Sequence, residues 1–167
     1  MRLIPILSLC LALPACGGRG DAAARRHAAA AGDPAFAAVQ TRGAAAMGVN
    51  QYTSSHVFEP LPDGGRIALQ RDADDSAGTT AIRLHMDQIA AQFAAGDFHL
   101  PGFVHARSVP GTAVMAARRS AIRYAVDTLP RGAVLRLRSR DAAAVRAIHE
   151  FLAFQRQDHH AGAHHDS

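Results

Sequence analysis

The feature that most constrains the fold is a succession of patterns that occurs twice between residues 47 and 158. In each half, two segments in which apolar and polar residues alternate flank a turn containing proline and glycine, and a helical pattern follows. Alternation is typical of strands with one buried face, whereas apolar residues three and four positions apart are typical of amphipathic helices. The order ββαββα predicts an α+β fold, a two-layer sandwich of a four-stranded antiparallel sheet with two helices on one face.

The first half is expected to form strands over residues 56–61 and 66–71 and a helix over 79–95 that ends at Gly96. Polar residues 72–78 precede that helix, and we expect their aspartates to cap it. The second half is expected to form strands over 120–128 and 133–139 and a helix over 142–157 with Asp141 as its N-cap. Residues 97–114 are expected to be a long loop. The patterns leave the order of the strands in the sheet open.

The first fifteen residues predict a signal peptide of the lipoprotein type. Arg2 precedes an apolar segment, residues 3–13, that is too short to span a bilayer. A leucine three positions before Cys16 resembles a lipobox, so acylation of Cys16 is expected to anchor the chain at the periplasmic face of a bacterial membrane. Gly17 follows in place of the aspartate that retains lipoproteins in the inner membrane, which favours the outer membrane. Plain secretion is the alternative.

Cysteine usage excludes several kinds of site. Cys10 lies in the segment expected to be removed, and Cys16 is expected to be acylated. The mature chain would then have neither a free thiol nor a disulfide, which excludes thiol catalysis, iron–sulfur clusters and cysteine-ligated zinc. No C-x-x-C-H motif for covalent haem attachment is present.

Composition sets the domain limits. Residues 16–46 are rich in glycine and alanine and are expected to form a lipidated, largely disordered tether, while residues 159–167 are expected to be a disordered, histidine-rich tail. Residues 47–158 then form a single domain. All 18 basic residues are arginine and the formal net charge is +4. Without interleaved aromatic and basic residues, nucleic acid is not expected as a partner of this exported chain.

Histidine is the residue type that is most informative about a functional site in this chain. His56 shares the inward parity of its strand, and His85 and His149 flank the apolar stripes of the two helices. Met86 follows His85 directly, and His105 and Met115 bracket the long loop. The sequence therefore predicts a metal site whose imidazole and thioether ligands suit copper, with zinc or non-covalent haem as weaker options. The candidate ligands are His56, His85, His105, Met115, His149 and His159. The alternative is that each histidine is partly buried and bonded to a backbone carbonyl.

A second hypothesis is a non-enzymatic interaction module. Arg123, Arg136 and Arg138 are expected to share the face of the sheet that no helix covers. This face could meet anionic lipid or a protein of the cell envelope, or it could be an ordinary solvated surface. No G-x-S-x-G turn and no glycine-rich phosphate loop is present, so we expect no catalytic residues and favour a role without enzymatic activity.

Several stretches resemble a group of short, exported bacterial proteins and lipoproteins without an established function. These stretches are residues 47–58, 103–105, Pro110-Gly111 with Met115, and residues 147–159. The resemblance covers the expected domain but neither the tether nor the tail. It implies no particular chemistry and directs attention to His56, His105, Met115, His149 and His159.

Overall fold

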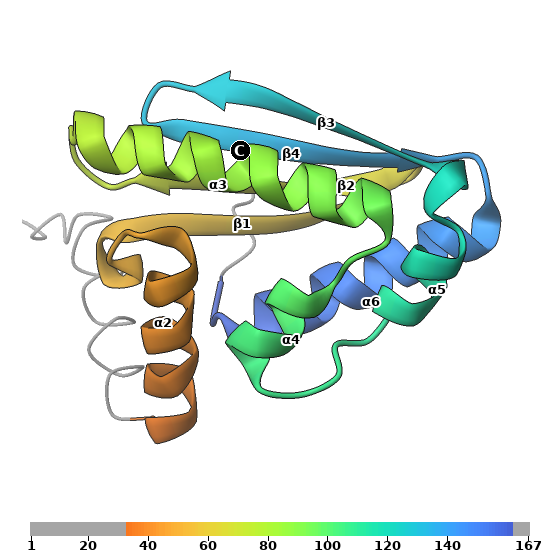
Figure 1. Cartoon of the computed structure of the whole chain (residues 1–167), viewed down its shortest axis with the longest axis horizontal. Helices are drawn as coiled ribbons and strands as arrows, with labels where there is room; N and C mark the ends of the chain where they lie inside the picture. The colour runs from red at the N-terminus through yellow and green to blue at the C-terminus, as the bar shows by residue number, and fades with distance from the viewer. Residues whose placement is uncertain (1–32, 162–167) are drawn as a thin grey trace, which may run out of the picture.

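Four strands of eight residues each form one antiparallel sheet in the computed structural model, which describes residues 33–161 (Figure 1). The strands are β1 (Ser54–Leu61), β2 (Gly64–Arg71), β3 (Ile122–Leu129) and β4 (Gly132–Ser139). Their order in the sheet is β1-β2-β4-β3, so the two hairpins meet where β2 pairs with β4. Ile67 lies opposite Leu135 at this junction. The sheet and the two predicted hairpins are confirmed, and the structure adds the strand order.

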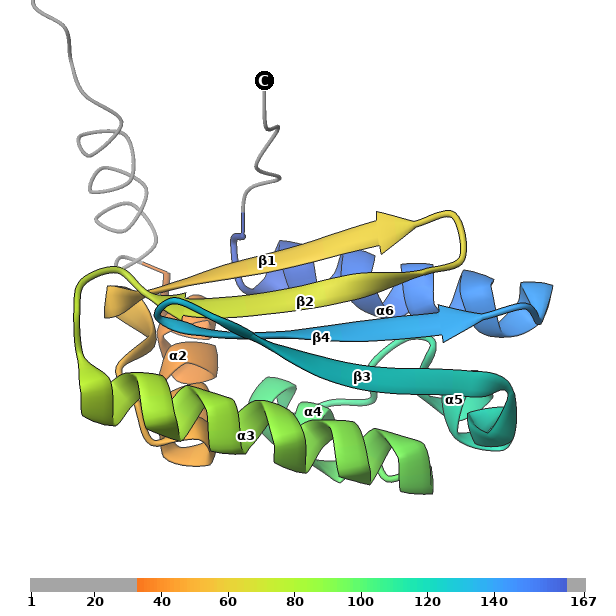
Figure 2. The ribbon, with the colours of Figure 1, turned by 90° about the horizontal axis from the view of Figure 1, so that it is seen from above.

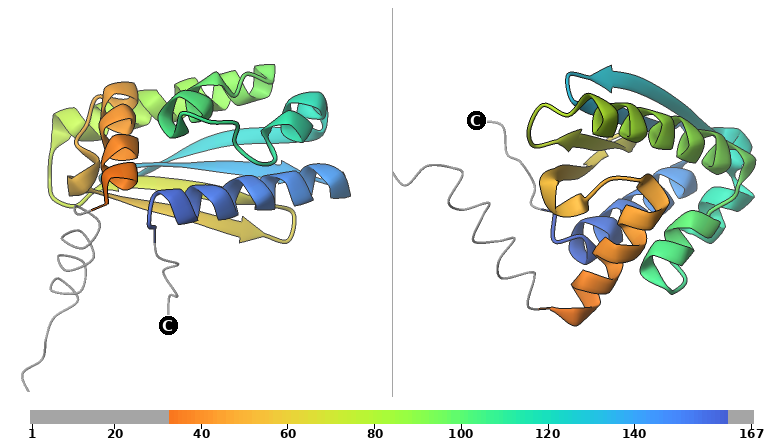
Figure 3. Two further views of the ribbon diagram at one scale, coloured as in Figure 1. Left: turned by 90° about the horizontal axis from the view of Figure 1, so that it is seen from below. Right: turned by 60° about the vertical axis from the view of Figure 1, so that its left-hand side comes forward.

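The two long helices cover the same face of the sheet, as predicted. Helix α3 (Ser76–Ala95) lies across β3 and β4, and helix α6 (Ala142–Asp158) lies across β1 and β2 (Figures 2 and 3). The carboxylates of Asp75 and Asp141 accept hydrogen bonds from the first turns of α3 and α6. Gly96 ends α3 in the left-handed conformation, with φ of 82°. These caps explain why the helix boundaries could be predicted closely.

The two halves of the fold are related by an approximate two-fold symmetry. The hairpin turns have matching sequences, Leu-Pro-Asp-Gly at residues 61–64 and Leu-Pro-Arg-Gly at 129–132. Each turn bonds to the end of the central strand of the other hairpin. The Ser139 amide donates to the Asp63 carbonyl at 2.8 Å, and the Arg71 amide donates to the Arg131 carbonyl at 2.9 Å. The turns thereby join the hairpins at both ends of their shared edge.

The core lies between the sheet and the two long helices. Inward side chains of the central strands, such as Leu135 and Leu137, meet Ile82 of α3 and Ile148 of α6, and all four are fully buried. Burial of a side chain of this size contributes about 1.5–3 kcal/mol. The apolar side chains at alternate positions of the strands therefore determine which face of the sheet the helices cover.

The segment predicted to be a long loop instead contains helical turns. Helix α4 (His99–His105), helix α5 (Thr112–Ala117) and the 3-10 turn η2 (Arg119–Ala121) connect the two halves. Val104 and Met115 bury their side chains there. Gly111 precedes α5 with φ of 80°, and its backbone lies so close to the Ala147 carbonyl of α6 that a Cβ atom would overlap it. Gly111 therefore allows α5 to pack closely against α6.

The tether expected over residues 16–46 is wrong in its second part, because a helix begins at Pro34. Helix α2 (Pro34–Met47) follows an Asp33 cap, buries Phe36 and Val39, and packs against α4; the 3-10 turn η1 (Gln51–Thr53) then leads into β1. Its alanine-rich sequence has only a weak apolar stripe, which is why no element was predicted. The start of the expected tail is likewise ordered, because the His159 amide donates to the Gln155 carbonyl.

The signal peptide, Cys16, the first part of the expected tether and residues 162–167 lie outside the described residues. Within residues 33–161, no helix is both long and apolar enough to cross a membrane.

Candidate functional site

A cavity of about 90 Å³ lies at one end of the layer between the sheet and the helices. Its wall is built from α2, η1, β1, β2, α3, α4 and the C-terminal part of α6. Most of the surface is apolar and includes Met47, Phe58, Met86, Phe93 and Leu100. A space of this size exceeds what one water molecule needs, about 10–15 Å³. It can therefore hold several waters or a small ligand.

Four histidines from four different elements line this cavity. His56 comes from β1, His85 from α3, His105 from the end of α4, and His159 directly follows α6. The His159 ring stacks on the His56 ring with centroids 5.4 Å apart, and it meets the His105 ring edge-on at 5.1 Å. The fold therefore gathers four of the six predicted site residues around one space.

Polar atoms without a partner are concentrated at this cavity. In residues 33–161, four buried side-chain polar atoms make no hydrogen bond, and three of them belong to cavity-lining residues: Gln51 Oε1, His85 Nδ1 and His159 Nδ1. The fourth is the hydroxyl of Tyr124 on β3. A buried polar atom without a partner costs about 1–3 kcal/mol. Such a cluster indicates a site that a ligand or ordered water completes.

Three of the cavity histidines, His56, His85 and His159, have lowered pKa values. Burial, together with the positive charge that a neighbouring His85 would carry, lowers the pKa of His56 from 6.5 to about 4. Burial alone lowers the pKa of His85. The pKa of His159 is lowered well below 6.5, first by burial and then by the nearby His56, His105 and His160. At neutral pH these three rings therefore carry no charge and each has a nitrogen lone pair.

Unlike His85 and His159, His105 has a hydrogen-bond partner at each of its two ring nitrogens. Its Nδ1 lies 2.5 Å from the Asp158 carboxylate and its Nε2 lies 3.0 Å from Gln155 Oε1. Arg107 donates to the other oxygen of the same carboxylate. Because both ring nitrogens already have partners, neither is open to a ligand. Its role is to support His159 and the C-terminal end of α6.

Two predicted site residues lie away from the cavity. His149 donates from Nε2 to the Leu61 carbonyl at 2.9 Å. This contact matches the alternative to metal binding, in which a histidine is bonded to a backbone carbonyl. Met115 is fully buried in the core beneath α5. Neither side chain lines the cavity. Met47, Gln51 and Gln155 do line it, although no pattern in the sequence singled them out.

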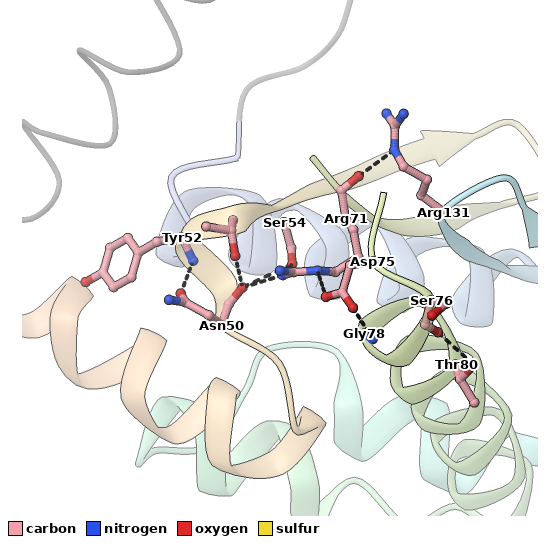
Figure 4. A network of polar contacts seen from close by, with 10 residues as sticks. Asn50, Tyr52, Ser54, Arg71, Asp75, Ser76, Gly78, Thr80 and Arg131 are labelled. Atoms are coloured by element: carbon pink, nitrogen blue, oxygen red, sulfur yellow. Dashed lines mark hydrogen bonds and ion pairs between the residues drawn. The ribbon is translucent and has the colours of Figure 1, made fainter. Parts of the chain in front are cut away.

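A polar network fixes the wall that carries Gln51 (Figure 4). The Arg71 guanidinium donates to the Asn50 carbonyl at 3.0 Å, to the Ser54 hydroxyl at 2.7 Å and to the Asp75 carboxylate at 3.0 Å. Asp75 in turn caps α3 at Gly78. The network joins η1, the two outer ends of the first hairpin and the start of α3. It holds the segment after α2 in place beside the cavity.

The arginines on the open face of the sheet are mostly paired. Arg66 pairs with Glu59, Arg136 with Asp127 at 3.0 Å, and Arg138 with Asp63 at 3.5 Å. These pairs lower the positive potential that the second hypothesis requires.

No group of three His, Cys, Asp or Glu side chains that could hold a metal ion is found among the described residues. Comparison with known proteins gives no further assignment: no protein-family model matches the chain, and searches of the curated proteins and of the solved structures find no significant match. The resemblance of residues 47–159 to short exported proteins therefore stays an expectation from the sequence. The functional argument rests on the cavity itself.

Proposed function

We propose that this protein is a non-enzymatic binding module of the bacterial cell envelope that holds a small ligand in the histidine-lined cavity. The observation that carries the proposal is the cluster of unpaired polar atoms from Gln51, His85 and His159 in an otherwise apolar wall. Small-molecule sites combine an apolar surface with a few convergent polar groups in the same way. The signal peptide and acylation of Cys16 remain part of this proposal and would place the module at the periplasmic face of the membrane.

Binding is favoured over catalysis by the residues that surround the cavity. Its described lining contains histidines but no Ser, Thr, Cys, Asp or Glu side chain that could act as a nucleophile beside them. At the cavity, His105 pairs with Asp158, and its second ring nitrogen is bonded to Gln155. A catalytic histidine needs that nitrogen for the proton it transfers.

The test uses phenol, whose ring fits an apolar wall and whose hydroxyl both donates and accepts a hydrogen bond. We expect phenol to shift the NMR signals of the His85 and His159 rings and to raise the melting temperature. At a concentration 100 times its Kd, a ligand stabilises the folded state by about 2.7 kcal/mol. Ala46 lines the cavity, so Ala46→Leu should fill part of it and abolish both responses.

Ala45→Leu is the matched control, because Ala45 is the preceding residue of α2, is exposed and does not line the cavity. Its response to phenol should equal that of the unmodified protein. If phenol does not bind to the unmodified protein, the cavity is not a binding site. The same conclusion follows if Ala46→Leu and Ala45→Leu respond alike to phenol.

A further inference from the structure

We propose that the natural ligand of the cavity is a short-chain monocarboxylic acid, whose carboxyl group pairs with the ring of His159 and whose carbon chain lies against the apolar wall. This inference rests on the proposed function, since it names the chemical class of the ligand in the same cavity. Only one imidazole has to contact the carboxyl group, so the other histidines need not lie within bonding distance of it.

His159 is placed to receive a carboxyl group. Its ring lines the cavity, and its buried Nδ1 has no hydrogen-bond partner in residues 33–161. The ring lies between two others, since its centroid is 5.4 Å from that of Phe58 and 5.1 Å from that of His105. A protonated imidazole donates from both nitrogens, and its hydrogen bond to a carboxylate is about twice as strong as a neutral one. A carboxyl group at Nδ1 would therefore satisfy an atom that the protein leaves unpaired.

Two arginines place positive charge beside the cavity. Arg42 of α2 donates to the Val104 carbonyl at 2.6 Å, and Arg156 of α6 donates to the Phe58 carbonyl at 3.4 Å. Both Val104 and Phe58 line the cavity. In the described part of the chain, neither arginine forms an ion pair with a carboxylate. Both side chains are partly buried, so solvent screens their charge less than it would at the surface.

The carboxylates near the cavity are already engaged. Asp158 lies beside His105 and Arg107, and Asp33 of α2 lies 4.0 Å from His160. The lining that the structure describes contains no Asp or Glu side chain. An ammonium group would therefore enter an apolar space without a compensating negative charge, which is costly. The balance of charge around the cavity favours an acidic ligand over a basic one.

Binding should be coupled to the uptake of one proton. Burial and the nearby His56, His105 and His160 lower the pKa of His159, so its ring is neutral at neutral pH. His85 of α3 acts in the same way on His56, which stacks on His159 from β1. A carboxylic acid is ionised at this pH. Because an anion beside a neutral ring would lack a counter-charge in the apolar cavity, a proton shared between the carboxyl group and the ring has to enter with it.

The experiment is a calorimetric titration with butyrate at about pH 7.5, 6.5 and 5.5. The protein is the mature chain from Cys16 onward, with Cys16→Ser so that no acyl chain is attached. We expect one equivalent of butyrate to bind, with a Kd that falls about tenfold for each unit by which the pH falls, because one proton is taken up. Butan-1-ol, which has the same carbon chain without the carboxyl group, should bind more weakly and independently of pH. Ala46→Leu should abolish the binding of both compounds.

Variants of single side chains test the assigned contacts. His159→Gln should weaken butyrate binding by about tenfold or more and leave the affinity for butan-1-ol unchanged, which also shows that this variant keeps the cavity. His149→Gln is the matched control, because it removes an imidazole that bonds to Leu61 outside the cavity. Arg156→Gln should also weaken butyrate binding, whereas Arg136→Gln, which removes a charge paired with an aspartate on the open face of the sheet, should not.

Three results would overturn the carboxylic acid inference: no stoichiometric binding of butyrate, an affinity for butyrate that does not change with pH, or an equal loss in His159→Gln and His149→Gln. A protein that binds phenol but not butyrate would retain the proposed function and lose only this inference. A protein that binds neither would lose both.

Discussion

At the scale of single residues, the environment of each histidine decides its role. His149 and Arg83 occupy corresponding places in the two halves, and each bonds to the carbonyl of the leucine that begins a hairpin turn. His149 donates to Leu61, and Arg83 donates to Leu129 at 2.8 Å. His149 is therefore a structural contact of α6 with the first hairpin. His56, His85 and His159 have lowered pKa values because they are buried together.

The stability of the folded protein should decrease as the pH falls from about 6.5 to about 4. The pKa of His56 is about 4 when folded and 6.5 when unfolded, so the unfolded state binds more protons in this range. His56 stabilises the fold fully above pH 6.5 and loses its contribution, on the order of 2–3 kcal/mol, on acidification. Urea denaturation at several pH values measures the effect.

His56→Asn should make the stability depend less steeply on pH between 6.5 and 4. His99→Asn is the control, because His99 is exposed at the start of α4. A slope that is the same in the His56 variant as in the unmodified protein would contradict the assigned role of burial.

At the scale of elements, the short helices cover parts of the core and of the cavity that the two hairpins and the long helices do not cover. Helices α2 and α4 provide one wall of the cavity, and α5 packs against α6. These elements depend on tertiary contacts, since short helices are marginal in isolation. Gly111 illustrates this dependence, because its positive φ and its contact with the Ala147 carbonyl both require the absence of a side chain.

Gly111→Ala should lower the free energy of unfolding by about 1–3 kcal/mol, because an alanine would be strained at this φ and would also overlap α6. Gly102→Ala in α4 is the matched control. Gly102 has room for a Cβ atom and lies within a helix, so alanine there should stabilise the protein by about 0.5–1 kcal/mol. Chemical denaturation of both variants checks the pair. Equal effects at the two positions would refute the close approach of α5 to α6.

At the scale of the whole molecule, helices cover one face of the sheet and the opposite face is open (Figure 3). The open face is the predicted arginine face. On neighbouring strands, Arg123 lies opposite Arg138 and Arg66 lies opposite Arg136. Ion pairs with Glu59, Asp127 and Asp63 offset most of its positive charge. Surface pairs of this kind contribute little to stability, but they reduce the field that reaches a partner.

The domain, prepared without an acyl chain, should therefore bind weakly to vesicles that contain 30 mol% (about one lipid in three) phosphatidylglycerol. Co-sedimentation at low and high salt should give similar, small bound fractions, and Arg136→Ala with Arg138→Ala should change them little. Strong binding that salt or this double variant removes would instead support the arginine face as a lipid-binding surface.

Local patterns in the sequence suffice to specify the two hairpins, the two long helices and the face of the sheet on which the helices pack. Alternation with a period of two, the capping residues Asp75 and Asp141, and the glycine at 96 are local signals that act within a few residues. Helix α2 and the short helices α4 and α5 could not be predicted in this way. Their alanine, proline and glycine residues carry weak local preferences, and burial against other elements decides their conformation.

Which residues form the site depends on how the elements pack together in three dimensions. Parity and helical spacing placed His56 and His85 near the core, but the meeting of β1, α3, α4 and the end of α6 depends on the strand order. The same patterns described His149 equally well, although its ring bonds to a hairpin carbonyl. Spacing along the chain specifies the direction of a side chain, whereas the distance between side chains on different elements follows from how those elements pack.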